Sequence, residues 1–168
     1  MITVNRFVLV VSVVGMTACA SSGSTSSGGS VPSGPARWTG SFKQTQMATS
    51  AVLGPATPNR GFGSITLTPD ADGKKMRVEL SINAPVATGS QIAWAIYNGV
   101  CGSPAPMVTG EMQFPPIEVT GSGNGSVRAN MSFELDSHSA YHANVYWSSR
   151  ASDLNDVMMC APLVFGAR

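Results

Sequence analysis

The stretch Lys75-Met76-Arg77-Val78-Glu79-Leu80-Ser81-Ile82 decides the fold class, because polar and apolar residues alternate over its whole length. Strict alternation places the apolar side chains on one face of a β-strand and the polar ones on the other. A second stretch, Val127–Leu135, repeats this pattern. Both stretches follow dipeptides typical of hairpin turns, Asp72-Gly73 and Asn124-Gly125. The sequence therefore predicts strands with one buried and one wet face.

Six further segments have the short, apolar character of strands. They are Trp38–Lys43, Gly63–Thr68, Gln91–Asn98, Met107–Gln113, His142–Ser148 and Met158–Phe165. No long segment has the period of an amphipathic helix. We therefore predict an all-β domain over residues 37–168, with about eight strands in an antiparallel Greek-key sandwich or barrel.

Length and composition exclude several classes of protein. The 168 residues allow one domain of ordinary size, and only 11% of them are charged. Ten Lys and Arg residues balance nine Asp and Glu residues, and no basic run occurs. This argues against nucleic acid or anionic lipid as an electrostatic partner.

The first 18 residues have the composition of a secretory signal peptide. Arg6 supplies a positive charge before the apolar run Phe7–Val14. That run is far shorter than the roughly 20 residues of a membrane-spanning helix, so a transmembrane anchor is the weaker alternative. The segment Met16-Thr17-Ala18-Cys19 resembles the lipobox of bacterial lipoproteins, although Met replaces the usual Leu. This resemblance implies cleavage before Cys19 and lipidation of that residue; a soluble secreted protein is the alternative.

Residues 19–36 form a Ser/Gly-rich segment that holds too few apolar side chains to build a core. Such a chain behaves as a flexible coil, and about 17 residues of it reach on the order of 20–25 Å. A lipid on Cys19 would hold the domain at a membrane through this tether. Ala20 resembles the sorting residue of outer-membrane lipoproteins. We therefore expect a lipid-anchored protein of the cell envelope, at the outer membrane and facing the periplasm or the surface.

Cys101 and Cys160 remain once Cys19 is assigned to lipid. In a secreted compartment an even pair of cysteines is usually oxidised. We therefore predict a disulfide between them, which ties the loop after Gln91–Asn98 to the last strand.

Two segments around these cysteines resemble the copper/zinc superoxide dismutases and the related CHRD (chordin-like) domains. They are Gln91-Ile92-Ala93-Trp94-Ala95-Ile96-Tyr97-Asn98-Gly99-Val100-Cys101-Gly102 and Met158-Met159-Cys160-Ala161-Pro162-Leu163. The similarity covers approximately Ala36 to Arg168. It implies a dismutase-like Greek-key fold.

The same resemblance indicates where metal ligands would lie. Two copper-binding histidines of the family match Trp94 and Ile96, and a later one matches Tyr146. The guiding arginine of the family matches Val157, and the zinc-binding segment, Gly102–Gly125, contains neither His nor Asp. We therefore expect the fold without catalytic residues, metal or cofactor, because function depends on the site and not on the fold.

The chain contains two histidines, His138 and His142. Residues four apart on a strand share a face but lie about 13 Å apart, too far to share one metal ion. A curled loop at His138, helped by Asp136, is the alternative. We expect both to be solvated or hydrogen-bonded.

Four aromatic residues indicate a candidate contact surface. Trp94, Tyr97, Tyr146 and Trp147 lie on the two strands that carry the metal site in the resembling family. Neighbours on a strand face opposite sides, so only one of Tyr146 and Trp147 belongs to the core. Core packing explains the group equally well.

Two functions remain open. The first is a non-catalytic envelope lipoprotein whose domain binds a protein, glycan or small ligand, or is structural. The alternative is a metal-dependent, dismutase-type copper oxidoreductase or copper-handling protein that uses His138 and His142.

Overall fold

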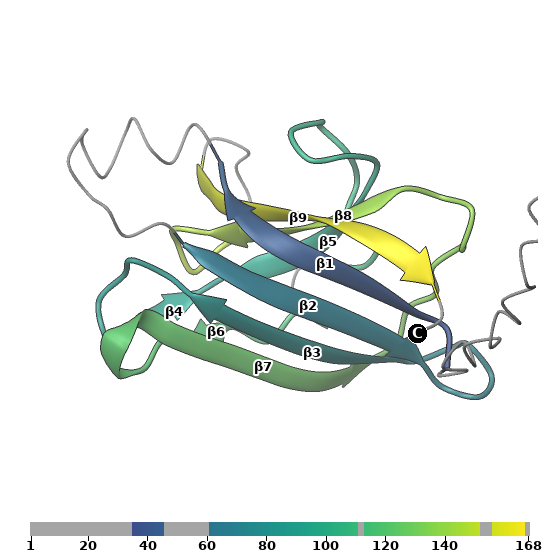
Figure 1. The fold of residues 1–168 in the computed structure, drawn as a ribbon, viewed down its shortest axis with the longest axis horizontal. Coiled ribbons are helices and arrows are strands. Elements are labelled where there is room, and N and C mark those ends of the chain that lie inside the picture. Colours follow the sequence, from purple (N-terminus) through teal and green to yellow (C-terminus); the bar gives the residue numbers. More distant parts are fainter. Residues whose placement is uncertain (1–34, 46–60, 111–112, 152–155, 167–168) are drawn as a thin grey trace, which may run out of the picture. The chain divides into compact units, whose positions relative to one another are not determined.

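The computed structural model describes residues 35–45, 61–110, 113–151 and 156–166. The predicted signal peptide, Cys19 and most of the predicted tether lie outside these ranges. The elements are β1 (Arg37–Gln44), β2 (Phe62–Pro69), β3 (Met76–Asn83), β4 (Gln91–Ile92), β5 (Trp94–Asn98), β6 (Ile117–Glu118), the 3-10 helix η2 (Gly121–Gly123), β7 (Asn124–Met131), β8 (Tyr141–Tyr146) and β9 (Val157–Gly166) (Figure 1). Within the described ranges, no helix has the length and apolar character needed to cross a membrane.

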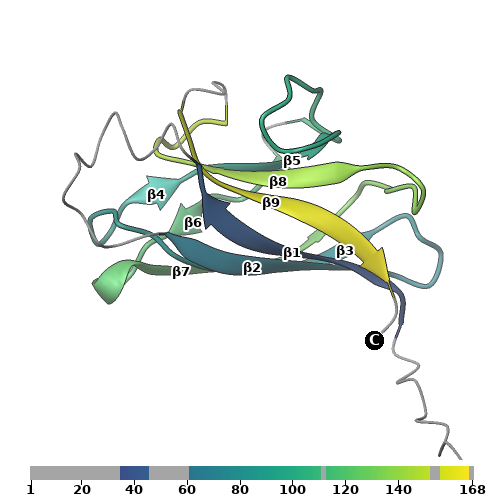
Figure 2. The ribbon, with the colours of Figure 1, turned by 45° about the horizontal axis from the view of Figure 1, so that its top comes forward.

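The domain is all-β, as the alternating stretches predict. Seven strands form one antiparallel sheet in the order β5-β8-β9-β1-β2-β3-β7, which curls into a half-barrel. Figure 2 shows β5 and β8 on one side and β2, β3 and β7 on the other, with β9 and β1 between them. The apolar faces of the two sides therefore meet in one core.

Short strands link the two ends of this sheet. β4 precedes β5 by one residue and pairs with β6 through Gln91↔Glu118 and Ile92↔Ile117. Directly after β6, Val119 forms a bridge to Gly125 at the start of β7. The chain thus connects the β5 side of the half-barrel to its β7 side by backbone pairing.

Three aromatic side chains pack between these sides. Trp94 lies edge-on to Phe114, with ring centroids 4.9 Å apart, and Phe114 lies 6.4 Å from Phe133. All three are buried. They belong to the core cluster that includes Leu67, Val78 and Ile96.

The alternation predicted for Lys75–Ile82 and Val127–Leu135 is confirmed in β3 and β7. Met76 pairs with Met131 and Leu80 with Val127, and all four side chains are buried. Between them, polar residues of both strands are exposed. The second strand ends at Met131, earlier than the pattern indicates.

Two local predictions are wrong. The described residues of the predicted strand Met107–Gln113 form no strand: Met107 makes a single bridge to Tyr97, and residues 111–112 lie outside the described ranges. Asn124-Gly125 is not the turn but the start of β7. The turn before it is made by Ser122 and Gly123, whose φ angles are positive. A Cβ at residue 123 would collide with the carbonyl oxygen of Ala84, so glycine is required there.

Candidate functional site

The outer face of β1, β2, β3 and β7 carries small polar side chains in register. Ser41 pairs with Ser64, Ser64 with Ser81, and Ser81 with Ser126. These four residues are exposed. Because directly opposed side chains on adjacent strands point the same way, they form one line across four strands, which we call the hydroxyl row.

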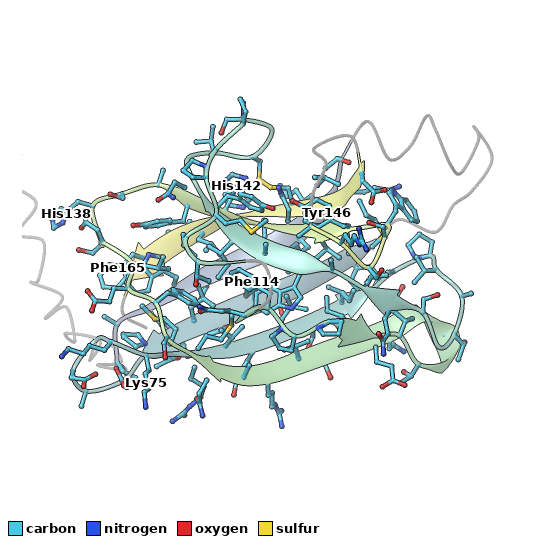
Figure 3. All side chains as sticks on the ribbon, turned by 180° about the vertical axis from the view of Figure 1, so that it is seen from behind. Lys75, Phe114, His138, His142, Tyr146 and Phe165 are labelled. Carbon is cyan, nitrogen blue, oxygen red and sulfur yellow. A yellow bond between two sulfur atoms is a disulfide. The ribbon has the colours of Figure 1, made fainter. Side chains whose placement is uncertain are left out.

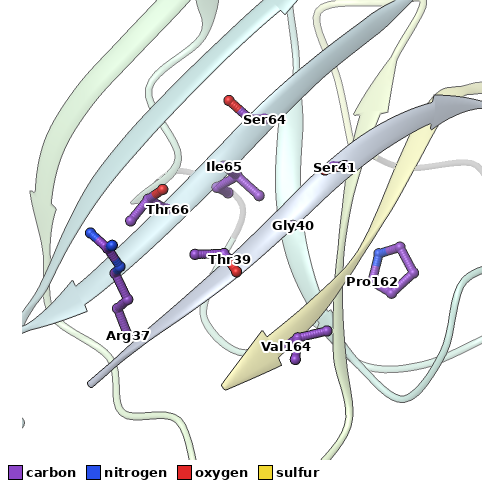
Figure 4. A pocket seen from close by; sticks show the side chains of 9 residues that line it. All are labelled: Arg37, Thr39, Gly40, Ser41, Ser64, Ile65, Thr66, Pro162 and Val164. Carbon is purple, nitrogen blue, oxygen red and sulfur yellow. The ribbon is translucent and has the colours of Figure 1, made fainter. Parts of the chain in front are cut away.

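A groove of about 410 Å³ lies at one end of the hydroxyl row, over β9, β1 and β2 (Figure 4). Its polar lining is Arg37, Thr39, Ser41, Ser64 and Thr66. The rest of its lining is Gly40, Ile65, Pro162 and Val164. Figure 4 shows Arg37 beside Thr66 at one end of this groove, with Val164 and Pro162 along β9.

The local sequence explains why the surface is hollow here. Serine and threonine are short, so they leave the sheet surface open where longer residues would cover it. β1 and β9 pair at Thr39↔Val164 and again at Lys43↔Cys160, and the ladder is interrupted between these two pairs. Pro162 lies in that interval and cannot donate a backbone hydrogen bond.

A second hollow, of about 480 Å³, lies at the other end of the hydroxyl row. Its lining includes Ser81 and Ser126, together with Glu118, Thr120 and Asn124. Each hollow therefore contains two members of the row. The two hollows and the row form a continuous polar track across the outer face.

Cationic side chains surround this track. Lys75, Arg77 and Arg128 are exposed on the same face, and Arg37 lines the first groove. Among the described residues, none of these four cations has an ion pair within 4 Å. The Nε atom of Arg37 is buried and has no hydrogen-bond partner in the described structure. The face thus places positive charge beside a line of hydroxyl groups.

A separate polar cluster lies on one face of the paired strands β5 and β8, where Figure 3 labels His142 and Tyr146. The Tyr146 hydroxyl donates to the Tyr97 hydroxyl at 2.7 Å, and Tyr97 donates to the Ala151 carbonyl at 3.2 Å. The Tyr97 ring stacks on His142 with centroids 5.5 Å apart. Tyr97, Tyr146 and His142 are buried. The cluster is therefore a packed part of the domain and not an open site.

Burial of the predicted aromatic surface favours its core-packing alternative. Trp94, Tyr97 and Tyr146 are all buried, and Trp147 is half-buried against the core. Trp94 also donates its indole N–H to the Pro115 carbonyl at 2.7 Å. Four aromatics on two strands thus do not form an exposed contact surface. The polar track on the opposite strands takes its place as the candidate site.

The two histidines have different surroundings. His138 is exposed in a turn, where its Nδ1 atom lies 3.2 Å from the Asp136 carboxylate. Hydrogen bonds from His138 and Ser139 hold the pKa of Asp136 below its ordinary value. His142 is fully buried on β8. Within the described ranges, no three His, Cys, Asp or Glu side chains gather as a metal site.

The tautomer of His142 follows from its contacts. Its Nδ1 atom lies 3.1 Å from the Gly99 carbonyl, which can only accept, so Nδ1 carries the proton. Nε2 is buried and has no hydrogen-bond partner in the described structure. The same is true of Oδ1 of Asn144, two residues later. Burial lowers the pKa of His142, and the bond to Gly99 opposes this only in part. The neutral form of the imidazole is therefore favoured in the folded protein relative to the unfolded chain.

This buried imidazole predicts an acid-sensitive fold. Below the ordinary pKa of 6.5, the unfolded chain binds a proton that folded His142 does not bind. The free energy of unfolding should therefore fall as the pH drops below that value, by at most about 1.4 kcal/mol per pH unit. Urea unfolding at a series of pH values measures this slope. His142→Gln should flatten it and His138→Gln should not; equal slopes in both variants would contradict the assignment.

Cys101 and Cys160 form the predicted disulfide, with Cα atoms 6.0 Å apart. The bond joins the loop after β5 to β9, as expected. The same loop pairs back on β5 through Asn98 N–H to the Pro106 carbonyl and Val108 N–H to the Ile96 carbonyl. The loop is thus attached at both its disulfide and its return to β5.

Comparison of the chain with protein-family models, curated proteins and solved structures gives no match. The candidate site therefore rests on the residues of this chain. The signal that would have indicated it in the sequence is the polar position at every second residue of four strands. Without the strand register, those positions do not indicate that the four serines are aligned.

Proposed function

We propose that the chain is a lipid-anchored envelope protein whose β-domain is a non-catalytic binding domain. The observation that carries this proposal is the polar track: two hollows joined by the hydroxyl row on an outer sheet face. Hollows of several hundred Å³ are of the size that binds small molecules or parts of larger ones. Cys19 and the Ser/Gly-rich tether supply the membrane attachment.

A Greek-key, dismutase-like arrangement belongs to the same proposal. A Greek key has three consecutive strands and a fourth that returns to lie beside the first. Here β4 with β5, then β6 and β7 follow one another, and β8 returns to pair with β5. This pairing supports the similarity that the segments around Cys101 and Cys160 indicate.

The buried tyrosine pair supports a binding role over copper chemistry. Copper sites in proteins are built from imidazole, thiolate and thioether groups. The matched positions hold Trp94, Ile96 and Tyr146, and the Tyr146 hydroxyl is already bonded to Tyr97. The side chains at these positions are used in packing.

Cell fractionation tests the anchoring part of the proposal. We expect the wild-type chain in the membrane fraction and Cys19→Ser in the soluble envelope fraction, since the lipid supplies most of the membrane affinity. Ser21→Ala is the matched control and should fractionate like the wild type. The intact mass of the purified chain should show loss of residues 1–18 and addition of acyl chains. An uncleaved mass, or a Cys19→Ser chain that stays with membranes, would refute the anchor.

A further inference from the structure

We propose that the outer face of β1, β2, β3 and β7 binds an acidic polysaccharide, which lies along the hydroxyl row. This inference rests on the binding role proposed above and names the ligand class. It follows from the spacing of the hydroxyl groups, the length of the side chains and the distribution of charge on this face.

The spacing of the row suits a chain of sugar residues. Neighbouring strands lie about 4.8 Å apart, so Ser41, Ser64, Ser81 and Ser126 present hydroxyls at that interval over roughly 14 Å. This interval is close to the length of one pyranose residue in a linear polysaccharide. A chain that crosses the strands would therefore meet one serine hydroxyl for each sugar.

The short serine and threonine side chains leave hollows in which a narrow ligand can reach the sheet surface. The two hollows, about 410 and 480 Å³, lie at the two halves of the row. Thr39 and Thr66 add hydroxyls beside it in the first groove. Hydroxyl groups both donate and accept hydrogen bonds, which matches the hydroxyls of a glycan.

The charge of the face favours acidic sugars. In the next line of register pairs, Thr66 lies opposite Glu79, and Glu79 opposite Arg128. In the line after that, Thr68 lies opposite Arg77. With Arg37, Lys43 and Lys75, the face holds five cations. Among the strand residues of this face, Glu79 is the only carboxylate.

Three carboxylates lie close to the five cations of this face: Glu79 on β3, Glu118 in the lining of the second hollow, and Asp70 in a hollow that Lys75 and Arg77 also line. The cations therefore still outnumber the carboxylates. Asp70 and Asp72, in the hairpin after β2, accept backbone N–H bonds from Lys75 and Lys74. Glu134 and Asp136 lie beyond β7, in the segment that leads to β8. The net positive charge of the face therefore stands out from a chain whose total charge is +1.

A polysaccharide fits this face better than a lipid bilayer does. Peripheral membrane binding combines cations with apolar or aromatic side chains that enter the interface. The exposed large apolar residues here are Phe62, at the end of β2 away from Arg77, and Val164 of β9 in the first groove; neither is adjacent to Arg77 or Arg128 in the strand register. The serine side chains are shorter than the arginine side chains on the same face. A narrow polysaccharide chain can therefore reach the serine hydroxyls, whereas a flat bilayer surface cannot.

Affinity electrophoresis tests the proposal with the full chain carrying Cys19→Ser, so that acyl chains play no part. The gels contain polygalacturonate, its fully methyl-esterified form, or no polysaccharide. We expect retardation by polygalacturonate and much less by the uncharged ester. Arg77→Gln with Arg128→Gln should weaken binding roughly tenfold, because two exposed ion pairs with the ligand are lost. Arg150→Gln removes one charge from the loop after β8 and should change nothing.

A second pair of variants tests the hydroxyl row. Ser64→Val with Ser81→Val removes one hydroxyl from each hollow while keeping residues that favour strands, and it should weaken binding about fivefold. Thermal unfolding of each variant shows that it is folded.

Three results would overturn the inference. They are no retardation by polygalacturonate, equal retardation by its ester, and vesicle binding that needs Arg77 and Arg128 but not the serines. The vesicles contain phosphatidylglycerol, and the last result would assign the face to a membrane. None of these results depends on Cys19. The polysaccharide inference can therefore fail while the lipid anchor is confirmed, and the lipid anchor can fail while the polysaccharide inference is confirmed.

Discussion

Trp94→Ala is expected to lower the free energy of unfolding by about 3–5 kcal/mol, the range for removal of a buried tryptophan. Trp94 is 1% exposed and packs edge-on against Phe114. Its indole N–H also donates to the Pro115 carbonyl at 2.7 Å, so the variant loses that hydrogen bond as well. Because Phe114 in turn contacts Phe133, the cavity opens where the β5 and β7 sides of the half-barrel meet.

Urea unfolding followed by circular dichroism measures this change. Trp147→Ala is the matched control, because Trp147 is only half-buried, and its loss should cost clearly less. Trp94→Phe should recover part of the stability, since it keeps a ring against Phe114 but not the N–H donor. Equal losses in Trp94→Ala and Trp147→Ala would contradict the assignment of Trp94 to the core.

Strands with one wet face could be predicted because their pattern is local. In β3 and β7 the polar and apolar residues alternate, so the pattern within each strand indicates both its existence and its buried face. β8 shows the limit of this rule. All of its residues are buried, since one face packs in the core and the other holds His142 and Tyr146 beside Tyr97. A strand covered on both faces has no alternation.

The break between β4 and β5, and the existence of β6, could not be predicted from the sequence. The predicted strand Gln91–Asn98 covers both β4 and β5, whereas β6 lies outside every predicted strand. β4 and β6 have two residues each and pair with one another across about 25 intervening positions. Met107–Gly110 have apolar residues like a strand, yet the segment returns from the disulfide loop and meets β5 at a single bridge. Pairing between distant segments decided both outcomes.

The polar track is a site that the sequence alone does not indicate. No basic run occurs in the sequence, because Arg37, Arg77 and Arg128 are separated by about 40 and 50 residues. The register of β1, β2, β3 and β7 brings them to one face. The absence of consecutive basic residues argues only against partners that bind a basic segment. It does not exclude partners that bind basic residues gathered on one face of a sheet.

Removal of the disulfide by Cys101→Ala with Cys160→Ala should lower the free energy of unfolding by about 4 kcal/mol, because the bond closes a loop across 59 residues. Most of this loss arises in the unfolded chain, which gains conformational freedom. In the folded protein, the loop after β5 keeps its hydrogen bonds at Asn98 and Val108. The variant should therefore fold with lower stability and keep the same strands.

Urea unfolding of the oxidised protein, the reduced protein and the double variant separates these contributions. The reduced protein and the double variant should agree within about 1 kcal/mol, since both lack the cross-link. Hydrogen exchange should increase first around Gly99, two residues before Cys101, and around His142, which is bonded to the Gly99 carbonyl, while β2 and β3 stay protected. Because the hydroxyl row lies on those strands and on β1 and β7, the folded variant should still bind polygalacturonate. Loss of binding in a folded double variant would place the ligand near the disulfide loop instead.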